Sequence, residues 1–363
     1  MRKTYKYRLY PTNAQADALD TQLAEACRLY NAALQERRDA YQQAGLSLNY
    51  YDQANQLKEI RSAGHLGLAN FSVAQDVLRR VEKTFKAFFR RVTAGLKAGY
   101  PRFKSRTRFD SYTFPSYGDG CRLTGARLYL QGIGHVKVKL HRPVEGTITT
   151  VTVKREAGKW YVCFSVKYAP VPLPETQERT GLDVGLLSFA TLSDGSTIDN
   201  PRCYKKAQAK LRRAQRRVAR CKRGGRNRRK AVILLQKAHA HIRNQRADFH
   251  HKTARTLVNT YGVIAVEDLN IKGLASGMLA KPVNDAGWSA FITKLAYKAA
   301  EAGRKLIHVD PRGTSQTCVC GAPVPKTLSQ RWHRCPECGL SAARDHVSAQ
   351  LILGLGLSLL GLT

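Results

Sequence analysis

The amino-acid sequence predicts a multidomain protein of mixed α+β and α/β class. Helical periodicity dominates residues 11–105, and short strand patterns dominate residues 111–168. From about residue 179 onward, strands and helices alternate. Three prolines, at positions 170, 172 and 174, lie between the second and third of these regions. Because closely spaced prolines favour an extended linker over packed structure, we expect a domain boundary near 169–178.

Length and charge narrow the possible functions. The chain has 363 residues, enough for roughly two to three domains, and its hydrophobic content of 43% is typical of a globular protein. The formal net charge is +35, and the natural partner of such a charge is a polyanion. A membrane surface is the weaker alternative, since no apolar run reaches about 18 residues. The apolar segment Leu351–Leu362 is interrupted by glycines, so we expect a core-packing helix end there.

The first residues, from Met1 to Tyr7, lack the hydrophobic region of a signal peptide. We therefore expect an intracellular protein, in which thiols stay reduced. The nine cysteines are then expected to be metal ligands and ordinary buried thiols rather than disulfides.

The first half of the chain begins with a strand pattern. Residues 3–9 alternate basic with aromatic or apolar side chains, and Pro11 ends this strand. Apolar residues recur at helical spacing over 13–43 and again over 71–95, which predicts two amphipathic helices. The second helix carries valines and phenylalanines on one face and arginines and lysines on the other.

Strand patterns follow these helices. The segment His135–Leu140 predicts one strand, and Thr147–Arg155 with Lys159–Tyr168 predicts a hairpin around Gly158.

The second half begins with the segment Gly181–Leu192, which predicts one buried strand containing a single carboxylate, Asp183. Burying a carboxylate without a partner is costly, so Asp183 must be hydrogen-bonded, paired or metal-bound. The dipeptide Asp194-Gly195 then predicts a hairpin turn. A second carboxylate, Glu267, ends the apolar run Val263–Val266.

The end of the chain is predicted to contain a helix over 285–302, a strand over Lys305–Val309, a cysteine-containing module and a last apolar helix that Asp345 opens. Each of the three acids thus lies at the end or edge of an apolar element. Two-metal hydrolysis of phosphodiesters needs a small set of acidic oxygens that hold two Mg²⁺ ions. Taken singly, each acid also has an ordinary structural interpretation: a turn-proximal acid, a salt-bridge partner and a helix N-cap.

A long basic run separates Asp183 from Glu267. Between Pro201 and Ala247 there is no acidic residue, and arginines and lysines are dense on both sides of Gly224-Gly225. Charge of one sign repels itself, which disfavours a packed helix without a counter-anion. The run therefore indicates nucleic-acid contact, mainly with phosphates, rather than a solvated helix face.

The cysteine module predicts a metal site. Its four thiols belong to Cys318-x-Cys320 and Cys335-x-x-Cys338, and four thiolates suit a tetrahedral, structural Zn²⁺. The first pair is one residue tighter than the usual spacing, and His333 is near enough to replace a poorly placed thiol. The alternative is two unrelated pairs of reduced cysteines.

These features, in this order, resemble the TnpB proteins of bacterial and archaeal insertion sequences, which are RNA-guided DNA endonucleases related to compact type V CRISPR effectors. The resemblance covers nearly the whole chain. The segments that carry it are Tyr5–Pro11, Gly181–Gly185, Ala247–Lys252, Val266–Asn270, Gly313–Cys318, Arg334–Gly339 and Arg344-Asp345.

The resemblance implies a domain organisation. A β-rich wedge domain would comprise residues 1–10 and 106–170, with a helical recognition domain inserted at 11–105. After a linker at 171–178, an RNase H-like (RuvC) nuclease domain would comprise 179–311 and 342–363. A zinc ribbon would occupy 312–341.

The resemblance also assigns residues. Asp183, Glu267 and Asp345 match the catalytic, Mg²⁺-binding acids, and Cys318, Cys320, Cys335 and Cys338 match the zinc ligands. Gln75 and Arg79 are candidate readers of a short motif beside the target. Together with the residues that charge alone indicates, the full set expected to contact nucleic acid is Lys6, Arg8, Gln75, Arg79, Arg102, Lys104, Arg212, Arg213, Arg216, Arg217, Arg220, Arg228, Arg229, His250, His251 and Lys252. For His250 and His251 the alternative is an ordinary surface or core histidine.

The chain departs from the family pattern at three places. The first cysteine pair is shortened, Ala343 replaces an acid two residues before Asp345, and Val347 replaces the usual asparagine two residues after it. All three catalytic acids are nevertheless present, so we expect an Mg²⁺-dependent, RNA-guided endonuclease. Its partners would be a guide RNA from the element's end and double-stranded target DNA, and its location the cytoplasm, at the nucleoid. The rival functions are a nuclease-inactive RNA-guided repressor and a transposase that needs no guide.

Overall fold

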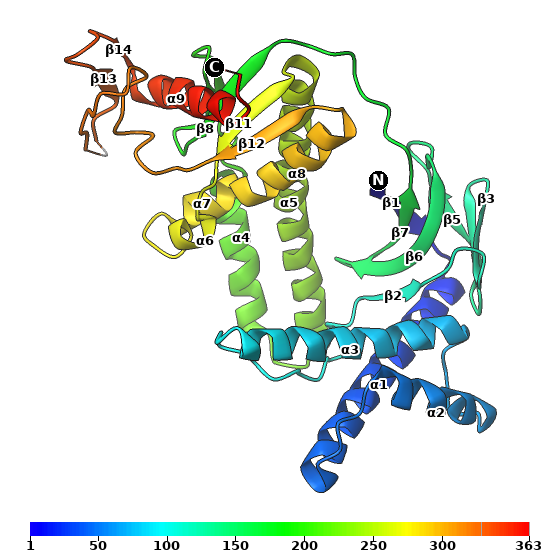
Figure 1. Ribbon diagram of the computed structural model, residues 1–363. Coiled ribbons are helices and arrows are strands. Elements are labelled where there is room, and N and C mark those ends of the chain that lie inside the picture. The colour runs from blue at the N-terminus through cyan, green and yellow to red at the C-terminus, as the bar shows by residue number, and fades with distance from the viewer. Residues whose placement is uncertain (328, 363) are drawn as a thin grey trace. The chain divides into compact units, whose positions relative to one another are not determined.

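The computed structural model describes residues 1–327 and 329–362 (Figure 1). Two compact units divide the chain, Met1–Ala169 and Pro170–Thr363. Each unit combines helices with a β-sheet, so the expectation of a multidomain protein of mixed α+β and α/β class is confirmed. Leu328, inside the range expected for the ribbon, and Thr363, at the end of the range expected for the nuclease domain, lie outside the described residues.

Unit 1 contains an antiparallel sheet of order β2-β6-β7-β1-β5-β4-β3. The first strand is central because it pairs with both β5 and β7, and its alternation buries Tyr5, Tyr7 and Leu9 on one face. The strands are β1 (Arg2–Tyr10), β2 (Ser111–Phe114), β3 (Cys121–Thr124), β4 (Arg127–Leu130), β5 (Gly134–Lys139), β6 (Thr147–Glu156) and β7 (Lys159–Lys167). The strand and hairpin predicted after residue 134 are confirmed to within one residue.

Three helices are inserted between β1 and β2: α1 (Asn13–Ala44), α2 (Tyr50–Ser62) and α3 (Phe71–Thr93). The first begins at a capping box in which Thr12 and Gln15 satisfy each other's backbone N–H groups. The predictions over 13–43 and 71–95 are confirmed, whereas α2 was not predicted. Its apolar face is narrow, but the capping box of Asn49 and Asp52 was a readable signal.

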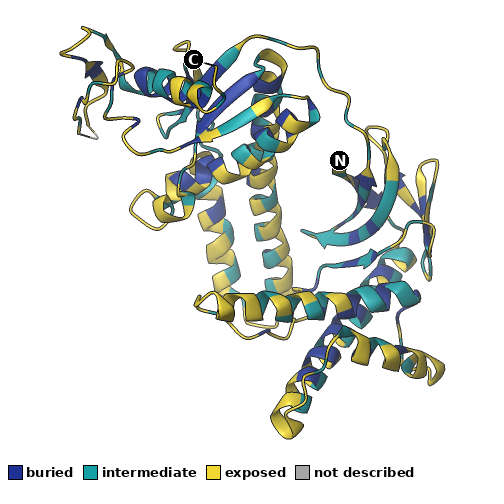
Figure 2. Ribbon diagram, in the orientation of Figure 1, coloured by how far each residue is buried: buried dark blue, intermediate teal, exposed yellow. Residues whose placement is uncertain are grey.

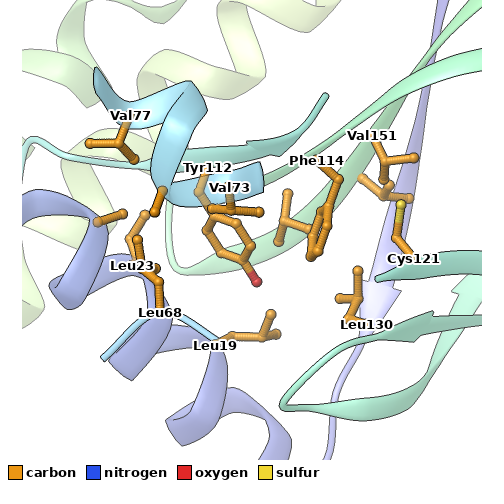
Figure 3. Close-up of a cluster of buried hydrophobic side chains, with 14 of the residues drawn as sticks. Leu19, Leu23, Leu68, Val73, Val77, Tyr112, Phe114, Cys121, Leu130 and Val151 are labelled. Carbon is orange, nitrogen blue, oxygen red and sulfur yellow. The ribbon is translucent and has the colours of Figure 1, made fainter. Parts of the chain in front are cut away.

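The helices pack on the sheet through one apolar cluster (Figure 3). Leu19 and Leu23 of α1 and Val73 and Val77 of α3 are buried with the aromatic and aliphatic residues of β2, β4 and β6. Burial of a leucine side chain stabilises a fold by about 1.5–3 kcal/mol, so this cluster joins helices and sheet into one body.

Unit 2 contains a five-stranded sheet of order β10-β9-β8-β11-β12. The strands β8, β11 and β12 are parallel, and β9 runs antiparallel to both β8 and β10. This is the RNase H-like arrangement that the sequence predicted. The strands are β8 (Arg179–Val184), β9 (Ser188–Leu192), β10 (Thr197–Asp199), β11 (Val263–Glu267) and β12 (Lys305–Val309).

One strand prediction was wrong in extent. The segment Gly181–Leu192 is two antiparallel strands rather than one, and β8 and β9 pair across a turn at 185–187. The Gly185 N–H donates to the Phe189 carbonyl oxygen and closes this turn. Both strands are apolar, so the run of hydrophobic residues concealed the reversal. The turn predicted at Asp194-Gly195 joins β9 to β10, as expected.

Helices cover both faces of this sheet. On one face, residues of α5, α7 and α8 share a core with Leu182 and Val266, and on the other face α9 packs against β8 and β11. A Cβ atom on Gly181 would collide with the Ala349 carbonyl oxygen, so glycine allows α9 to lie directly on β8. The helices are α4 (Cys203–Arg220), α5 (Arg226–Thr260), α6 (Ile271–Leu274), α7 (Ala280–Ala286), α8 (Trp288–Glu301) and α9 (Arg344–Ser358).

Two further predictions needed adjustment. The helix expected over 285–302 is divided at Gly287, whose φ of 67° ends α7 before α8 begins. The basic run folds as two helices, α4 and α5, that pack on each other through buried Leu211 and Ile242 while most of their cations stay exposed (Figure 2). In the described part of the chain, no helix is both long and apolar enough to cross a membrane.

Candidate functional site

The three predicted acids lie on one side of the unit-2 sheet. Side chains alternate along a strand, so Asp183 faces the same side as Gly181, which contacts α9. Ala265 also contacts α9, at Gly356, and Glu267 follows it by two residues on β11. Asp345 lies in the first turn of α9 itself. Strand alternation and helix packing therefore bring the three carboxylates to the carboxyl ends of β8 and β11.

The electrostatics of these acids reflect this convergence. Burial, followed by the charges of Glu267 and Asp345, raises the pKa of Asp183 well above its usual value, and the nearby Arg344 opposes the shift. Burial also raises the pKa of Glu267. The Arg344 guanidinium lies 3.1 Å from an Asp345 oxygen. Carboxylates that are buried close to one another tend to bind either protons or a cation, because both reduce their repulsion.

A hydroxyl group that the sequence analysis did not single out contacts one of these acids. Thr314 is only 4% exposed, and its Oγ1 lies 2.5 Å from Glu267 Oε1 and 3.1 Å from the Pro311 carbonyl oxygen. This hydrogen bond lowers the pKa of Glu267 against the effect of burial. The sequence contained one signal for Thr314, since this residue lies within the Gly313–Cys318 segment that carries part of the family resemblance.

The first turns of α9 show what replaces the family's asparagine. Val347 is fully buried, and its aliphatic side chain offers no polar group near Asp345. The neighbouring His346 Nε2 donates to the Ser193 carbonyl oxygen at 3.1 Å, which ties the start of α9 to the β9–β10 turn. Asp345 is thus held by its helix, by Arg344 and by this tether.

The four cysteines form the compact metal-ligand group in the described part of the chain. Their Sγ atoms all lie within 4.8 Å of one another, with 3.6 Å between Cys318 and Cys338 and 3.7 Å between Cys320 and Cys335. Four sulfurs around Zn²⁺ at about 2.3 Å would be about 3.8 Å apart, so the donor set fits this ion. The shortened first pair still reaches the group, because a turn at Gly321, with φ of 89°, aims both sulfurs inward.

His333, the alternative ligand in the sequence, lies outside the four-cysteine group and has a different partner. His333 is fully buried on β13 (Trp332–Arg334), which pairs with β14 (Ser341–Ala343). Its Nδ1 accepts a hydrogen bond from Lys326 Nζ at 2.6 Å. The backbone N–H of Cys338 donates to Cys335 and lowers the pKa of that thiol to about 7, which favours the thiolate that binds metal.

The basic residues of α4 and α5 form an exposed surface, here called the basic hairpin. Arg212, Arg213, Arg216, Arg217, Arg220 and Arg229 are all exposed. Arg228 is instead partly structural, because it donates to the Val218 and Cys221 carbonyl oxygens and closes the turn between the helices. Asp285 of α7 accepts from the Tyr204 and Lys205 N–H groups and thereby fixes the start of α4.

One residue of the set expected to contact nucleic acid is in the core. His250 is 1% exposed, lies against the rings of Phe189 and Phe291, and donates from Nε2 to the Ala286 carbonyl oxygen. That position excludes contact with nucleic acid, so His250 is a correction to the predicted set. The neighbouring His251 and Lys252 are exposed.

The buried His250 predicts a pH dependence of stability. Burial lowers its pKa to about 4, whereas the unfolded chain retains about 6.5. The contribution of neutral His250 to the free energy of unfolding is therefore complete above pH 6.5. It is lost as the pH falls towards 4, by about 3 kcal/mol in total. Urea unfolding at pH 7 and pH 5 should show this loss in the native chain and a smaller one in His250→Gln. His251→Gln is the matched control, and an equal loss in His250→Gln would contradict the assignment.

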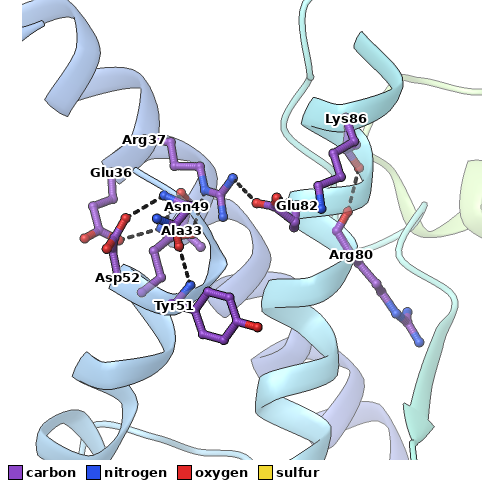
Figure 4. A network of polar contacts seen from close by, with 11 residues as sticks. Ala33, Glu36, Arg37, Asn49, Tyr51, Asp52, Arg80, Glu82 and Lys86 are labelled. Atoms are coloured by element: carbon purple, nitrogen blue, oxygen red, sulfur yellow. Dashed lines mark hydrogen bonds and ion pairs between the residues drawn. The ribbon is translucent and has the colours of Figure 1, made fainter. Parts of the chain in front are cut away.

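In unit 1, Gln75 and Arg79 lie on the wall of a groove of about 620 Å³ between α2 and α3, together with Tyr50 and Lys83. A polar network holds the helices on either side of it (Figure 4). Arg37 of α1 donates to Glu82 of α3 at 2.7 Å and to Gln53 of α2 at 2.8 Å. Hydrogen bonds through Arg37 therefore connect the helices that line the groove.

The remaining predicted contact residues of unit 1 are Lys6, Arg8, Arg102 and Lys104. Lys6 pairs with Glu156 at 2.7 Å and lies over the Tyr161 ring, and Arg8 lies over the same ring. Arg102 is exposed, and Lys104 lies over Tyr30. These four cations are accessible to different degrees and do not form one compact site.

Comparison with known proteins identifies the class. A family model described as "Probable transposase", OrfB_IS605, matches residues 146–277, a Cas12f1-like TNB domain matches 288–352, and a helix-turn-helix domain matches 1–45. The chain belongs to the TnpB family, as its motifs predicted.

Two relatives align along nearly the whole chain. A Streptomyces pristinaespiralis protein named "Putative RNA-guided DNA endonuclease" is 32% identical over 99% of this chain and 90% of its own length. InsQ of Escherichia coli K12, which carries the same designation, is 30% identical over 98% and 92%. The solved structure of the mini-RNA-guided endonuclease CRISPR-Cas_phi3 shares the fold, with a TM-score of 0.50 at 9% identity, covering 98% of this chain and 92% of that one.

Proposed function

We propose that the protein is an RNA-guided DNA endonuclease of an insertion sequence, which cuts double-stranded target DNA beside a short flanking motif. The observation that carries the proposal is the convergence of Asp183, Glu267 and Asp345 at one end of the unit-2 sheet. Phosphodiester hydrolysis by two metal ions requires such a group of carboxylates. The relatives named as RNA-guided DNA endonucleases support the same reaction, because they align along nearly the whole chain.

Asp183, Glu267 and Asp345 would hold Mg²⁺, an ion that prefers carboxylate and water ligands. The donor set fits, since burial and mutual repulsion raise the pKa of Asp183 and a divalent cation would offset both. When bound, such ions stabilise charge on the phosphate and make a water more acidic. The chain's own part is to hold the carboxylates in place, Glu267 through Thr314 and Asp345 through Arg344.

Cys318, Cys320, Cys335 and Cys338 would hold a structural Zn²⁺. Four thiolate ligands leave no open position for water, so this site would support the fold rather than catalysis.

The nucleic-acid contacts follow from charge. The exposed arginines of the basic hairpin would hold the phosphates of the guide RNA and of its duplex with target DNA, and affinity should fall steeply with salt. Gln75 and Arg79, in the groove of unit 1, are the proposed readers of the flanking motif. Base pairing between guide and target would supply the remaining specificity.

The domain roles are part of the same proposal. Residues 1–10 and 106–170 would be the wedge, 11–105 the recognition domain and 171–178 the linker. Residues 179–311 and 342–363 would be the nuclease domain, with the ribbon at 312–341. The protein would act on DNA in the cytoplasm, at the nucleoid.

The test uses the protein expressed with the DNA that flanks it in its native element, so that its own RNA copurifies. Duplexes that match this RNA, with randomised sequence beside the target, are incubated with the particle and Mg²⁺. Guide-dependent cleavage beside one enriched motif is expected. Tight guide-dependent binding without cuts would indicate a repressor instead, and cleavage or joining of element ends without guide RNA would indicate a transposase.

A further inference from the structure

The apolar face of α3 extends beyond the core that it helps to form. Val73, Val77 and Val81 are buried on that face. The same helical spacing continues through Phe85 and Phe89, but Phe89 is 57% exposed, and Val92 beyond it is 52% exposed. The last two turns of the helix therefore present aromatic and aliphatic side chains that nothing in the core of unit 1 covers.

Four rings gather at this end of α3 and on the segment that follows it. Phe85 and Phe89 are stacked with centroids 6.4 Å apart, and Tyr100 meets Phe85 edge-on at 5.9 Å and Phe88 at 5.5 Å. Phe88 and Phe89 are 5.2 Å apart. Tyr100 is itself 47% exposed. We call Phe85, Phe88, Phe89 and Tyr100 the aromatic platform, because mutual packing orders the rings while leaving part of their surface accessible.

The charge around the aromatic platform has one sign. From residue 83 to residue 109 the sequence contains no aspartate or glutamate. The cations of this segment are Lys83, Lys86, Arg90, Arg91, Lys97, Arg102, Lys104, Arg106 and Arg108. Lys86 pairs with Glu82, which lies just outside the segment. A second copy of the chain seated here would bring two such cationic segments together, and an uncharged protein partner would leave their charge uncompensated.

A ligand that is both anionic and aromatic matches this surface. Unpaired bases of a single strand stack on exposed rings, while their phosphates meet the neighbouring arginines and lysines. We propose that the aromatic platform binds an unpaired stretch of the guide RNA, an inference that rests on the proposed function. RNA is favoured over DNA because exposed apolar surface promotes aggregation unless it stays covered. A guide remains bound between targets, whereas target DNA is replaced at each one.

The experiment compares stacking with charge. Phe89→Ala and Tyr100→Ala are expected to lower the affinity for the copurified RNA on the order of tenfold each. The slope of affinity against salt should be unchanged, since no phosphate contact is lost, whereas Arg90→Gln with Arg91→Gln should reduce that slope. Phe89→Trp should retain native affinity. Tyr41→Ala removes a ring of α1 that is even more exposed, at 67%, and is the control.

Three results would overturn the proposal. Unchanged RNA affinity in folded Phe89→Ala, with folding checked by circular dichroism, would remove the stacking role. If Phe89→Ala lowered the affinity only for single-stranded DNA of the same sequence, the aromatic platform would be a DNA-binding surface instead. Conversion of a dimer to a monomer by Phe89→Ala in sedimentation would make the surface a protein interface. None of these readouts depends on DNA cleavage, so a failure of the proposed cleavage activity would be seen separately.

Discussion

Replacing Asp183 by asparagine is expected to abolish guide-dependent DNA cleavage, with a loss of at least about a thousandfold, while RNA affinity stays within about twofold of native. Asparagine keeps the shape of the side chain but removes the charge that would hold Mg²⁺. It also removes the cost of burying a charge at this position and the repulsion from Glu267 and Asp345, so the variant should fold at least as well as the native chain. Cleavage of a matched duplex and binding of the copurified RNA are measured on the same preparation.

The Thr314 hydroxyl supplies a graded comparison with Asp183→Asn. Thr314→Val loses the hydrogen bond to Glu267 with little change in volume, and Thr314→Ser keeps it. Cleavage should fall in the valine variant and remain near native in the serine variant. The binding of Mn²⁺, measured by calorimetry, should weaken in Thr314→Val in parallel.

For Asp183→Asn, loss of RNA binding would show instead that this acid is structural.

Removal of zinc is the second change with a large expected effect. Among the described residues of the ribbon, the apolar cluster has Cys318, Val324 and Cys335 as its buried members, with Ala322 and Leu340 beside them. Such a core is too small to fold alone, and in comparable modules metal binding supplies about 10–16 kcal/mol. Cys338→Ser, or treatment with a strong chelator, should therefore unfold the ribbon and make it sensitive to protease.

Unfolding of the ribbon should also disturb the three carboxylates of the nuclease site. Thr314 lies at its entry, and β14 at its exit leads directly into Arg344 and Asp345. Cleavage is therefore expected to fall as the zinc content falls. Mass spectrometry measures that content, and one zinc ion per native chain is expected. Cys221→Ser, in the turn of the basic hairpin, changes a thiol outside the ribbon and should leave both quantities unchanged. Zinc well below one per native chain would contradict the ribbon assignment.

Local signals predicted most of the secondary structure. Apolar periodicity located α1 and α3, and alternation located β1 and the β6–β7 hairpin, because each pattern is complete within its own segment. Where two elements share one apolar run, as in β8 and β9, the sequence alone could not show the reversal. The helix α2 buries only Gln53 and Leu57, so its periodicity was too weak to notice.

The candidate site divides in the same way. The sequence suggested that Asp183, Glu267 and Asp345 converge on metal, but it did not contain the reason, which is the sheet order and the close packing of α9 at Gly181. His250 was misjudged, since a histidine beside basic residues has the same appearance in a sequence whether it faces solvent or a phenylalanine cluster. The role of Thr314 depends on a contact between distant segments, which no local pattern contains.

The position of Asp345 on α9 has a consequence for the nascent protein. The chain leaves the ribosome from its N-terminal end, so unit 1 and the basic hairpin emerge before α9 does. Until α9 lies on β8, the sheet carries two of the three acids and cannot complete their site. Under the proposed function, a chain that is still being synthesised would begin to bind RNA before it could cut DNA, because cutting would require its last described helix.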